Sequence, residues 1–535
     1  MGGGLMQLVA YGAQDVYLTG NPQITFWKVT YRRHTNFAME SIEQTFNGQA
    51  DFGRRVQCTV SRNGDLAYRT YLQITLPEIN QTDGGAATDG TQDCLARWLD
   101  YPGEQLISMV EVEIGGQRID RQYGDWMHIW NQLTLTSEQE AGYHKMIGQT
   151  SQLTYLTDRN FSDVATACGA TGVPEAVCAP RNALPETTLY IPLQFWFCRN
   201  PGLALPLIAL QYHEVKINIE IRPLDECLFA VTKINTADTN GTKVPNAYAK
   251  SLVAASLYVD YVFLDTDERR RMAQNPHEYL IEQLQFTGDE SIGSSSNKVK
   301  LNFNHPCKEL VWVVQPDLHV AYCDSFIGST TLHRALGAQP FNYTDALDAL
   351  PNTILAFGSR AQSGAAAGDV IDTNGLFTDG MPGAVEGTPV TADSQTGLDT
   401  ASGSAVSDAG VFVLAETALN MHCWGENPVV TAKLQLNGQD RFSEREGTYF
   451  DLVQPFQHHT RNPDTGINLF SFALRPEEHQ PSGTCNFSRI DNATLQLVVS
   501  AAAIGGVQTA KVRVYATNYN VLRIMSGMGG LAYSN

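Results

Sequence analysis

The feature that most constrains the fold is an internal duplication, in which three landmarks of the first half return in order in the second. The paired landmarks are Ser41–Gln44 with Leu280–Gln283, Val112–Gln117 with Leu434–Gln439, and Val215–Ile221 with Leu495–Val499. The offset is about 240 to 320 residues, far beyond the ~20–50 residues of a solenoid repeat. The chain therefore reads as two tandem copies of one domain-sized fold. A duplicated binding platform or shell fits this better than a duplicated catalyst.

Length and composition agree with two packed units. At 535 residues the chain exceeds what one hydrophobic core usually supports, and 43% hydrophobic residues are enough for a packed interior. Charged residues make up only 17%, below the usual quarter. We therefore expect neighbouring molecules to cover much of the surface.

The charge balance and the cysteines exclude several classes of function. A net charge of −20 argues against direct binding of nucleic acid, which needs Lys and Arg to release counterions. No apolar run is long enough for a membrane span, and the first residues do not resemble a signal peptide, so we expect synthesis and assembly in the cytoplasm. The ten cysteines include no Cys-x-x-Cys pair, which favours buried thiols over a zinc or redox site.

Alternation with a period of two dominates the chain and predicts an all-β fold. Val56, Cys58 and Val60 alternate with polar residues, Asn63-Gly64 predicts a tight hairpin turn, and Tyr71–Leu76 alternates again. Many further short runs of this kind are bounded by Gly, Pro, Asn and Asp, as expected for antiparallel β-sandwiches. Asp265 followed by acidic and then basic residues predicts one short helix over 266–274 between the copies.

Two segments have the composition of surface loops. Residues 358–410 are rich in Gly, Ala, Ser, Thr and Asp and can bury little, so we predict a long surface loop. Asn80–Asp93 is a shorter loop of the same kind in the first copy.

Several long runs in both copies and at both ends carry a family resemblance. The runs are Gln7–Phe26, Pro201–Val215, Pro276–Gly288, Leu436–Phe442, Pro481–Thr494 and Tyr519–Tyr533. Together they resemble the major capsid proteins of nucleocytoplasmic large DNA viruses, most closely the chlorovirus and algal-virus branch. The resemblance does not cover residues 80–95, 145–188, 228–250 and most of 315–425.

The resemblance implies a double jelly roll: two tandem eight-stranded antiparallel jelly-roll sandwiches with long loops and few short helices. The expected units are an N-terminal arm (1–26), a first jelly roll (27–265), a helical connector (266–278), a second jelly roll (279–520) and a C-terminal tail (521–535). The loop over 358–410 belongs to the second jelly roll.

The function implied is structural. Three chains would form a pseudohexagonal capsomer, and these homotrimers would tile the icosahedral shell of a large double-stranded DNA virus. The implied partners are neighbouring capsomers, minor capsid proteins, a penton protein and, at the inner face, the underlying viral membrane. The alternatives are a glycan-binding, lectin-like β-sandwich and a duplicated β-sandwich hydrolase. The hydrolase would need a pair of carboxylates facing a cleft, and the lectin would not need the arm or the glycine-rich tail.

No motif in the chain predicts catalysis, a cofactor or a metal. The adjacent pairs His458-His459 and His422-Cys423 could suggest ligands, but neighbours on a strand face opposite sides. The glycine clusters Gly2–Gly4 and Gly527–Gly530 do not open a helix after a strand, as phosphate binding requires. We therefore assign no catalytic, cofactor-binding or metal-binding residue.

Six Asn-x-Ser/Thr sequons occur in the chain. The resemblance implies glycosylation by virus-encoded enzymes at asparagines outside this motif, so the sequons are weak guides. Four of them are kept as candidate glycosylation sites: Asn80, Asn160, Asn240 and Asn342.

The ends and the loops differ in polarity. Residues 1–26 carry apolar side chains such as Leu8, Val9 and Tyr17, which predicts a covered position along the inner face of the shell. The loop over 358–410 is predicted to lie on the outer, host-facing surface.

Overall fold

The computed structural model describes residues 2–84, 94–154, 184–232, 242–323, 337–345, 425–505 and 508–533. The loop predicted over 358–410 lies outside these residues, as does most of the loop predicted over Asn80–Asp93. Four residues singled out in the sequence are also outside them: Asn160, Asn240, His422 and Cys423.

The first sandwich consists of two antiparallel four-stranded sheets. One has the order β1 (Phe37–Gln44), β11 (Ala254–Leu264), β3 (Leu66–Leu76) and β7 (Thr187–Pro192). The other has the order β2 (Arg55–Thr59), β9 (Val215–Ile221), β5 (Ile107–Ile114) and β6 (Gln117–Tyr123). Three short strands complete the description of this sandwich. β8 (Leu205–Pro206) pairs with β3, whereas β4 (Leu95–Trp98) and β10 (Leu228–Val231) pair with each other in a separate two-stranded sheet.

The second sandwich has the same plan. One sheet has the order β12 (His277–Phe286), β21 (Ala510–Met525), β15 (Pro306–Pro316) and β18 (Ile467–Ser471). The other has the order β14 (Ser296–Leu301), β20 (Ala493–Val499), β16 (Val429–Leu436) and β17 (Gln439–Glu446). Three short strands pair along the first sheet: β13 (Glu290–Ile292), β19 (Cys485–Asn486) and β22 (Met528–Leu531).

The two sandwiches share one topology. If the eight main strands of each are numbered along the chain, both have one sheet of order 1-8-3-6 and another of order 2-7-4-5. This is the jelly-roll order, and it confirms the predicted fold class of two tandem eight-stranded antiparallel sandwiches. The strands of the second sandwich begin after α10 (Thr266–Gln274), where Asp265 caps the helix by accepting a hydrogen bond from the Thr266 N–H.

Each duplicated landmark occupies the same place in both sandwiches. Ser41–Gln44 and Leu280–Gln283 lie on the first strand of each, and Val215–Ile221 and Leu495–Val499 on the seventh. The third landmark is the tight turn between the fourth and fifth strands. Its central residues have positive φ in both copies, at Gly115 and Gly116 in one and at Asn437 and Gly438 in the other. A turn of this kind matches the twist of a hairpin and favours Gly and Asn.

The hairpin predicted at Asn63-Gly64 is wrong. β2 and β3, which flank it, belong to different sheets of the first sandwich, so the connection crosses from one sheet to the other. The alternation on both sides was read correctly, but alternation does not say which strands pair.

Two hydrophobic cores fill the sandwiches. Inward residues of one sheet, such as Leu72 and Ile74, meet those of the other, such as Ile217 and Ile219, in the first core. Leu310, Trp312, Leu434 and Leu495 belong to the second core. Burial of such side chains stabilises a sandwich by about 1.5–3 kcal/mol each.

Helices connect the strands and cover their ends. The α-helices in the described residues are α1 (Gly3–Val9), α2 (Val16–Thr19), α3 (Pro102–Leu106), α4 (Gly124–Thr134), α5 (Ser137–Ile147), α6 (Ser151–Thr154), α8 (Trp196–Arg199), α9 (Pro245–Tyr248), α10, α12 (Gln454–His458) and α13 (Ala501–Ile504). The 3-10 helices are η1 (Gln81–Gly84), η3 (Pro201–Leu203), η4 (Leu224–Glu226), η5 (Asp317–Val320) and η9 (Phe487–Arg489), and η8 (Tyr449–Val453) is a π-helix. Across the described ranges, none of the helices is long and apolar enough to span a membrane.

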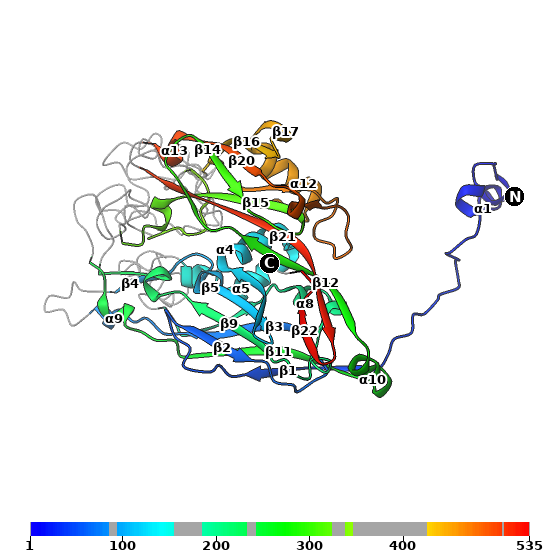
Figure 1. The fold of residues 1–535 in the computed structure, drawn as a ribbon, viewed down its shortest axis with the longest axis horizontal. Helices are drawn as coiled ribbons and strands as arrows, with labels where there is room; N and C mark the ends of the chain where they lie inside the picture. Colours follow the sequence, from blue (N-terminus) through cyan, green and yellow to red (C-terminus); the bar gives the residue numbers. More distant parts are fainter. Residues whose placement is uncertain are drawn as a thin grey trace.

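The two ends of the chain differ. Residues 2–36 extend away from the body of the molecule (Figure 1). Their large apolar side chains, including Phe26, Trp27 and Tyr31, are exposed. At the other end the structure differs from the predicted tail over 521–535. Residues 521–525 complete β21, and β22 folds back on it with Met525 paired to Met528. Leu522 and Ile524 are buried with Ile281 in the core of the first sandwich.

Candidate functional site

The two sandwiches contact each other at a junction that residues of both of them form. β1 and β11 lie at the lower edge of Figure 1, β14, β16 and β17 at the upper edge, and α4 lies between the two sandwiches. α4 begins directly after β6. Its side chains Trp126, Ile129 and Trp130 form a third hydrophobic cluster with residues of the second sandwich.

The second sandwich contributes the outer face of its β12–β21–β15–β18 sheet to this cluster. Val311, Val313, Leu469 and Tyr515 alternate with residues that face the core of the second sandwich, so the sheet is buried on both faces. Aromatic rings contact one another across the junction, where the centroids of Trp126 and Tyr515 are 5.4 Å apart. The junction therefore has the apolar, close-packed character of a domain core.

Ion pairs cross the junction beside these rings. Arg513 on β21 donates to Asp125 on α4 over 2.7 Å and to Asp289 over 2.9 Å. Burial alone would lower the pKa of Arg513, but the charge of Asp125 raises it, so the guanidinium stays charged. Arg222 of the first sandwich approaches the same Asp125 at 3.5 Å. Asp125 is thus shared by cations from both sandwiches.

A second buried group joins α8 to the second sandwich. Glu282 on β12 accepts from Arg199 on α8 over 3.1 Å and pairs with Lys308 over 2.8 Å. The Arg199 guanidinium also lies 4.0 Å from the centre of the Trp130 ring. Such a cation–π contact adds to the attraction where water is excluded.

His459 lies between two carboxylates in the second sandwich. Its Nε2 is 2.8 Å from Glu309 and its Nδ1 is 2.8 Å from Glu477. Burial alone would lower the pKa of His459, but the two carboxylates raise it to about 9. The prediction that His458 and His459 lie on a strand is wrong, because His458 is the last residue of α12. The carboxylates hold both ring nitrogens of His459, and His458 Nδ1 contacts the Leu474 carbonyl at 3.2 Å.

His128 on α4 belongs to a buried polar network. Its Nδ1 is 2.7 Å from Glu104, whose other oxygen accepts from Asn131 and from the Tyr143 hydroxyl. Burial raises the pKa of Tyr143 well above its usual value, and the charge of Glu104 adds to this, so the phenol stays a donor. These groups satisfy one another under α4. Among the described residues, no group of three or more His, Cys, Asp or Glu is arranged to hold a metal ion.

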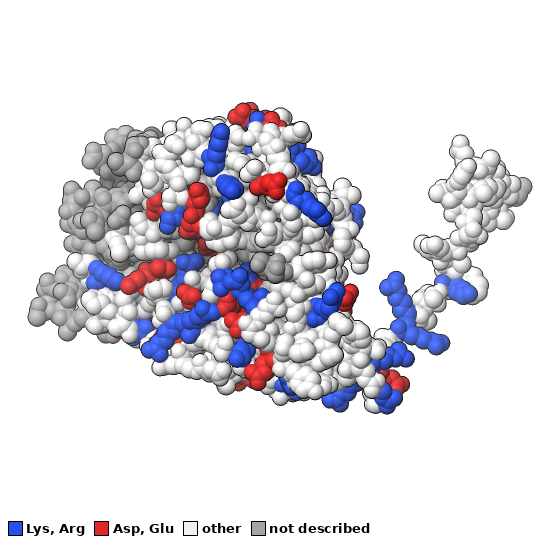
Figure 2. Space-filling model, viewed as in Figure 1, with Lys and Arg blue, Asp and Glu red and all other residues white. Residues whose placement is uncertain are grey.

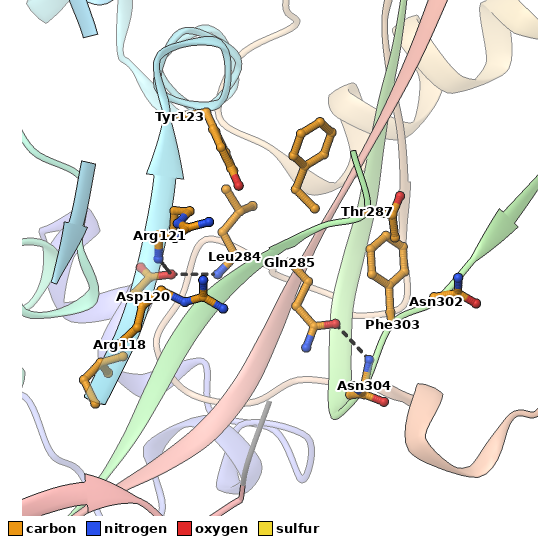
Figure 3. Close-up of a pocket in the computed structure, with 12 residues that line it drawn as sticks. Arg118, Asp120, Arg121, Tyr123, Leu284, Gln285, Thr287, Asn302, Phe303 and Asn304 are labelled. Atoms are coloured by element: carbon orange, nitrogen blue, oxygen red, sulfur yellow. Dashed lines mark hydrogen bonds between the residues drawn. The ribbon is translucent and has the colours of Figure 1, made fainter. Parts of the chain in front are cut away.

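An open cavity of about 320 Å³ lies between β6, the end of β12 and the segment that joins β14 to β15 (Figure 3). Asp120 is the one carboxylate among its lining residues. Burial raises the pKa of Asp120 to about 6, although it accepts hydrogen bonds from the Leu284 and Arg121 N–H groups. The two facing carboxylates that glycoside hydrolysis needs are not found among the residues that line it. This cavity therefore gives the hydrolase alternative no support.

Two of the four candidate glycosylation asparagines, Asn80 and Asn342, lie in the described part of the chain. Asn342 is hydrogen-bonded through its side chain: Nδ2 donates to Gln339 over 2.7 Å, and Oδ1 accepts from Thr344. Asn80 is half-buried, and its backbone N–H donates to Asp83. Asn160 and Asn240 lie outside the described residues.

Positive and negative side chains are interspersed over the body of the molecule, whereas the segment at the base of the arm carries basic residues and no acidic ones. Figure 2 shows Lys and Arg interspersed with Asp and Glu on the visible face. Lys28, Arg32 and Arg33, which follow the arm (1–26), are exposed, and no acidic residue occurs between 16 and 39. The sequence alone did not predict the junction residues Asp125, Glu282 and Arg513, whose partners lie far away in the chain.

Two sandwiches of identical strand order, joined through a buried helical junction, define a double jelly-roll protein. Residues 25–265 match the family model for the N-terminus of major capsid proteins, and residues 268–530 match that of the large eukaryotic DNA virus major capsid protein. The chain belongs to this family of major capsid proteins.

Relatives and solved structures agree. The chain is 75% identical to the major capsid protein of Phaeocystis pouchetii virus and 70% identical to that of Chrysochromulina ericina virus, each match covering 100% of both chains. A quasi-atomic model of the PBCV-1 virus capsid matches with a TM-score of 0.60 and 34% identity, over 96% of this chain and 100% of that one. The Faustovirus major capsid protein has the same fold at 14% identity, with a TM-score of 0.62 over 96% of this chain and 94% of that one. The chain is thus a structural protein of a virion capsid, which favours this function over the lectin-like alternative.

Proposed function

We propose that three copies of this chain form a pseudohexagonal capsomer, and that these homotrimers tile the icosahedral shell of a large double-stranded DNA virus. The observation that carries the proposal is the repetition of one strand order in two sandwiches placed side by side. A ring with three chains has six similar corners only if each chain supplies two of them. The low charged fraction of 17% supports extensive contact with neighbours.

The proposed orientation follows from the polarity of the ends and loops. The apolar arm (1–26) would run along the inner face, toward minor capsid proteins and the underlying viral membrane. Phe26 and Trp27 are exposed in the single chain, as expected for side chains that other molecules cover in the shell. The basic residues Lys28 and Arg32 follow them in the sequence. The loop over 358–410 would lie on the outer surface. The penton protein and neighbouring capsomers would contact the rim of the trimer.

The units of the chain are part of the proposal. The arm is 1–26, the first jelly roll 27–265, the helical connector 266–278 and the second jelly roll 279–520. The remaining residues, through β22, would act as an extension of the second sandwich that packs beneath the first.

We also propose that the protein has no catalytic activity, needs no cofactor and does not bind nucleic acid directly. Synthesis and assembly would take place in the host cytoplasm. Asn80, Asn160, Asn240 and Asn342 remain candidate glycosylation sites. At Asn342 the side chain would first have to give up its hydrogen bond to Gln339.

The oligomeric state tests the central proposal. Light scattering coupled to gel filtration should give three times the 58.7 kDa chain mass at micromolar concentration. Electron microscopy of purified particles should show capsomers with hexagonal outlines and threefold symmetry. A monomer across that concentration range, or a capsomer with twofold symmetry, would contradict the homotrimer.

A further inference from the structure

The junction inside one chain provides a template for contacts between chains. Within the chain, the helix that follows the fifth strand of the first sandwich covers the outer face of the 1-8-3-6 sheet of the second. Because both sandwiches share one topology, each possesses both surfaces: a helical element after its fifth strand and an outer 1-8-3-6 sheet face. Among the described residues, one surface of each kind is used in the junction and one of each kind is left.

The unused helical surface belongs to the second sandwich. The segment between β17 and β18 contains η8 and α12, which follow the fifth strand as α4 does in the first sandwich. Phe450 and Gln454 face inward and are buried, whereas Leu452 is 50% and Phe456 is 78% exposed. The spacing of Leu452 and Phe456 is four residues, the spacing of Trp126 and Trp130 on α4, so both pairs project from one face of a helix. We call Leu452, Val453 and Phe456 the helical patch.

The unused sheet surface belongs to the first sandwich. The outer face of β11, β3 and β7 carries Tyr258, Tyr71 and Tyr190, which form one aromatic row. Tyr71 and Tyr258 stack with their centroids 5.2 Å apart, and Tyr71 and Tyr190 are 6.2 Å apart. Tyr190 is 40% exposed. We call these three residues the tyrosine row. The corresponding face of the second sandwich is the one that α4 buries.

The two unused surfaces are chemically complementary. Aromatic side chains with polar tips are enriched at protein interfaces because they bury a large area and still form hydrogen bonds. The exposed Glu43 lies beside the tyrosine row as the pairing partner of Tyr258, and the exposed Arg445 lies beside the helical patch, over the Tyr449 ring. In Figure 1 the strands β1 and β11 and the helix α12 lie at opposite ends of the molecule. One chain therefore cannot bring its own two surfaces together.

We propose that the helical patch of one chain docks on the tyrosine row of a second copy, repeating between chains the contact that α4 makes within a chain. This inference rests on the proposed homotrimer and specifies its interface. The contact is head-to-tail, so each chain uses one surface to bind the next chain and the other to bind the previous one.

Two double variants test the two surfaces separately. Leu452→Asp/Phe456→Asp alters the helical patch, and Tyr190→Asp/Tyr258→Asp alters the tyrosine row. Each should lower the association constant by about two orders of magnitude or more, because buried aromatic anchors dominate interface energies. Tyr212→Asp is the control, since Tyr212 is 75% exposed and belongs to neither surface. It should remain trimeric. Circular dichroism and the melting temperature of each monomer should show that the fold is kept.

Mixing the two double variants tests the direction of the contact. Each variant retains the surface that the other has lost, so an equimolar mixture has one intact pair and should form a heterodimer that cannot close into a ring. Light scattering and cross-linking with isotopically labelled chains would detect it.

Trimers that persist in both variants would overturn the interface while leaving the homotrimer standing. An absence of heterodimers, or loss of the trimer in Tyr212→Asp, would also overturn it. A wild-type monomer would refute the homotrimer itself.

Discussion

Arg513 on the last long strand and Asp125 on α4 are 388 residues apart in the sequence, yet the arginine Nη1 donates to the aspartate Oδ2 over 2.7 Å. Both side chains are largely buried. The pair connects the two sandwiches in a region that is largely shielded from solvent.

The first prediction concerns this pair. Arg513→Met should lower the free energy of unfolding by about 3 kcal/mol, because the buried carboxylate of Asp125 then loses one of its two cationic partners. Urea unfolding followed by tryptophan fluorescence would measure the loss. Arg475→Met removes a cation from the exposed pair with Glu478 and should cost less than about 1 kcal/mol. Equal losses in the two variants would contradict a structural role for the junction pair.

The second prediction is a pH dependence that arises from His459. The pKa of this residue rises from 6.5 to about 9 on folding. Because the pKa is higher in the folded state, the protonated His459 stabilises the fold. This stabilisation is complete below about pH 6.5 and is lost as the pH rises through 9. The difference corresponds to about 3 kcal/mol.

Unfolding free energies measured from pH 6 to pH 9.5 should therefore decline in the wild type. His459→Gln should be less stable at pH 6, because Glu309 and Glu477 then lose their cation, and its curve should be flatter over this range. A wild-type curve with the same slope as that of His459→Gln would show that another group is responsible.

The third prediction compares two helical glycines. A Cβ at Gly124, the first residue of α4, would lie 2.2 Å from the Ile107 carbonyl oxygen, so Gly124→Ala should displace the helix and destabilise the protein. A Cβ at Gly142 in α5 would meet nothing within 4 Å. Gly142→Ala should therefore stabilise the protein by roughly 0.5–1 kcal/mol, the usual difference in helix propensity. Thermal unfolding would compare them, and a stabilising Gly124→Ala would contradict the close approach of the helix to β5.

The fourth prediction tests the proposed polarity on intact particles. Limited proteolysis should cleave first within residues 358–410, because their composition cannot form a core. Residues 1–26 should stay protected in particles and become sensitive in isolated capsomers, where the side chains of Phe26 and Trp27 are uncovered. Mass spectrometry of the fragments would identify the sites. Early loss of the arm from intact particles would reverse the proposed orientation.

The sequence predicted the fold because the duplicated landmarks are local features with a fixed structural meaning. Asn437-Gly438 and Gly115-Gly116 are turns that need positive φ, and Leu495–Val499 alternates because one of its faces is buried. Such features survive duplication, since each depends on its own few residues. The hairpin predicted at Asn63-Gly64 is wrong because turn chemistry does not reveal whether a chain pairs back or crosses to another sheet.

The junction was beyond the reach of local patterns. Trp126, Ile129, Trp130 and Leu133 have the spacing of a helix face, and Gly148 ends α5 with positive φ, so the helices could have been found. Their partners could not, because Asp125 meets Arg513 and Glu282 meets Arg199 only after both sandwiches have folded. The same holds for β22, whose glycines Gly529 and Gly530 resemble a flexible tail until they are paired with β21.

The far end of β21 has a consequence for how the protein is made. Leu522 and Ile524 belong to the core of the first sandwich, together with Ile281, although they follow every strand of that sandwich in the sequence. The first sandwich therefore cannot complete its core until the chain has been synthesised past residue 524. A prematurely terminated chain would expose this gap and remain recognisable to chaperones and proteases. We therefore expect chains truncated before Leu522 to be degraded rather than built into a shell.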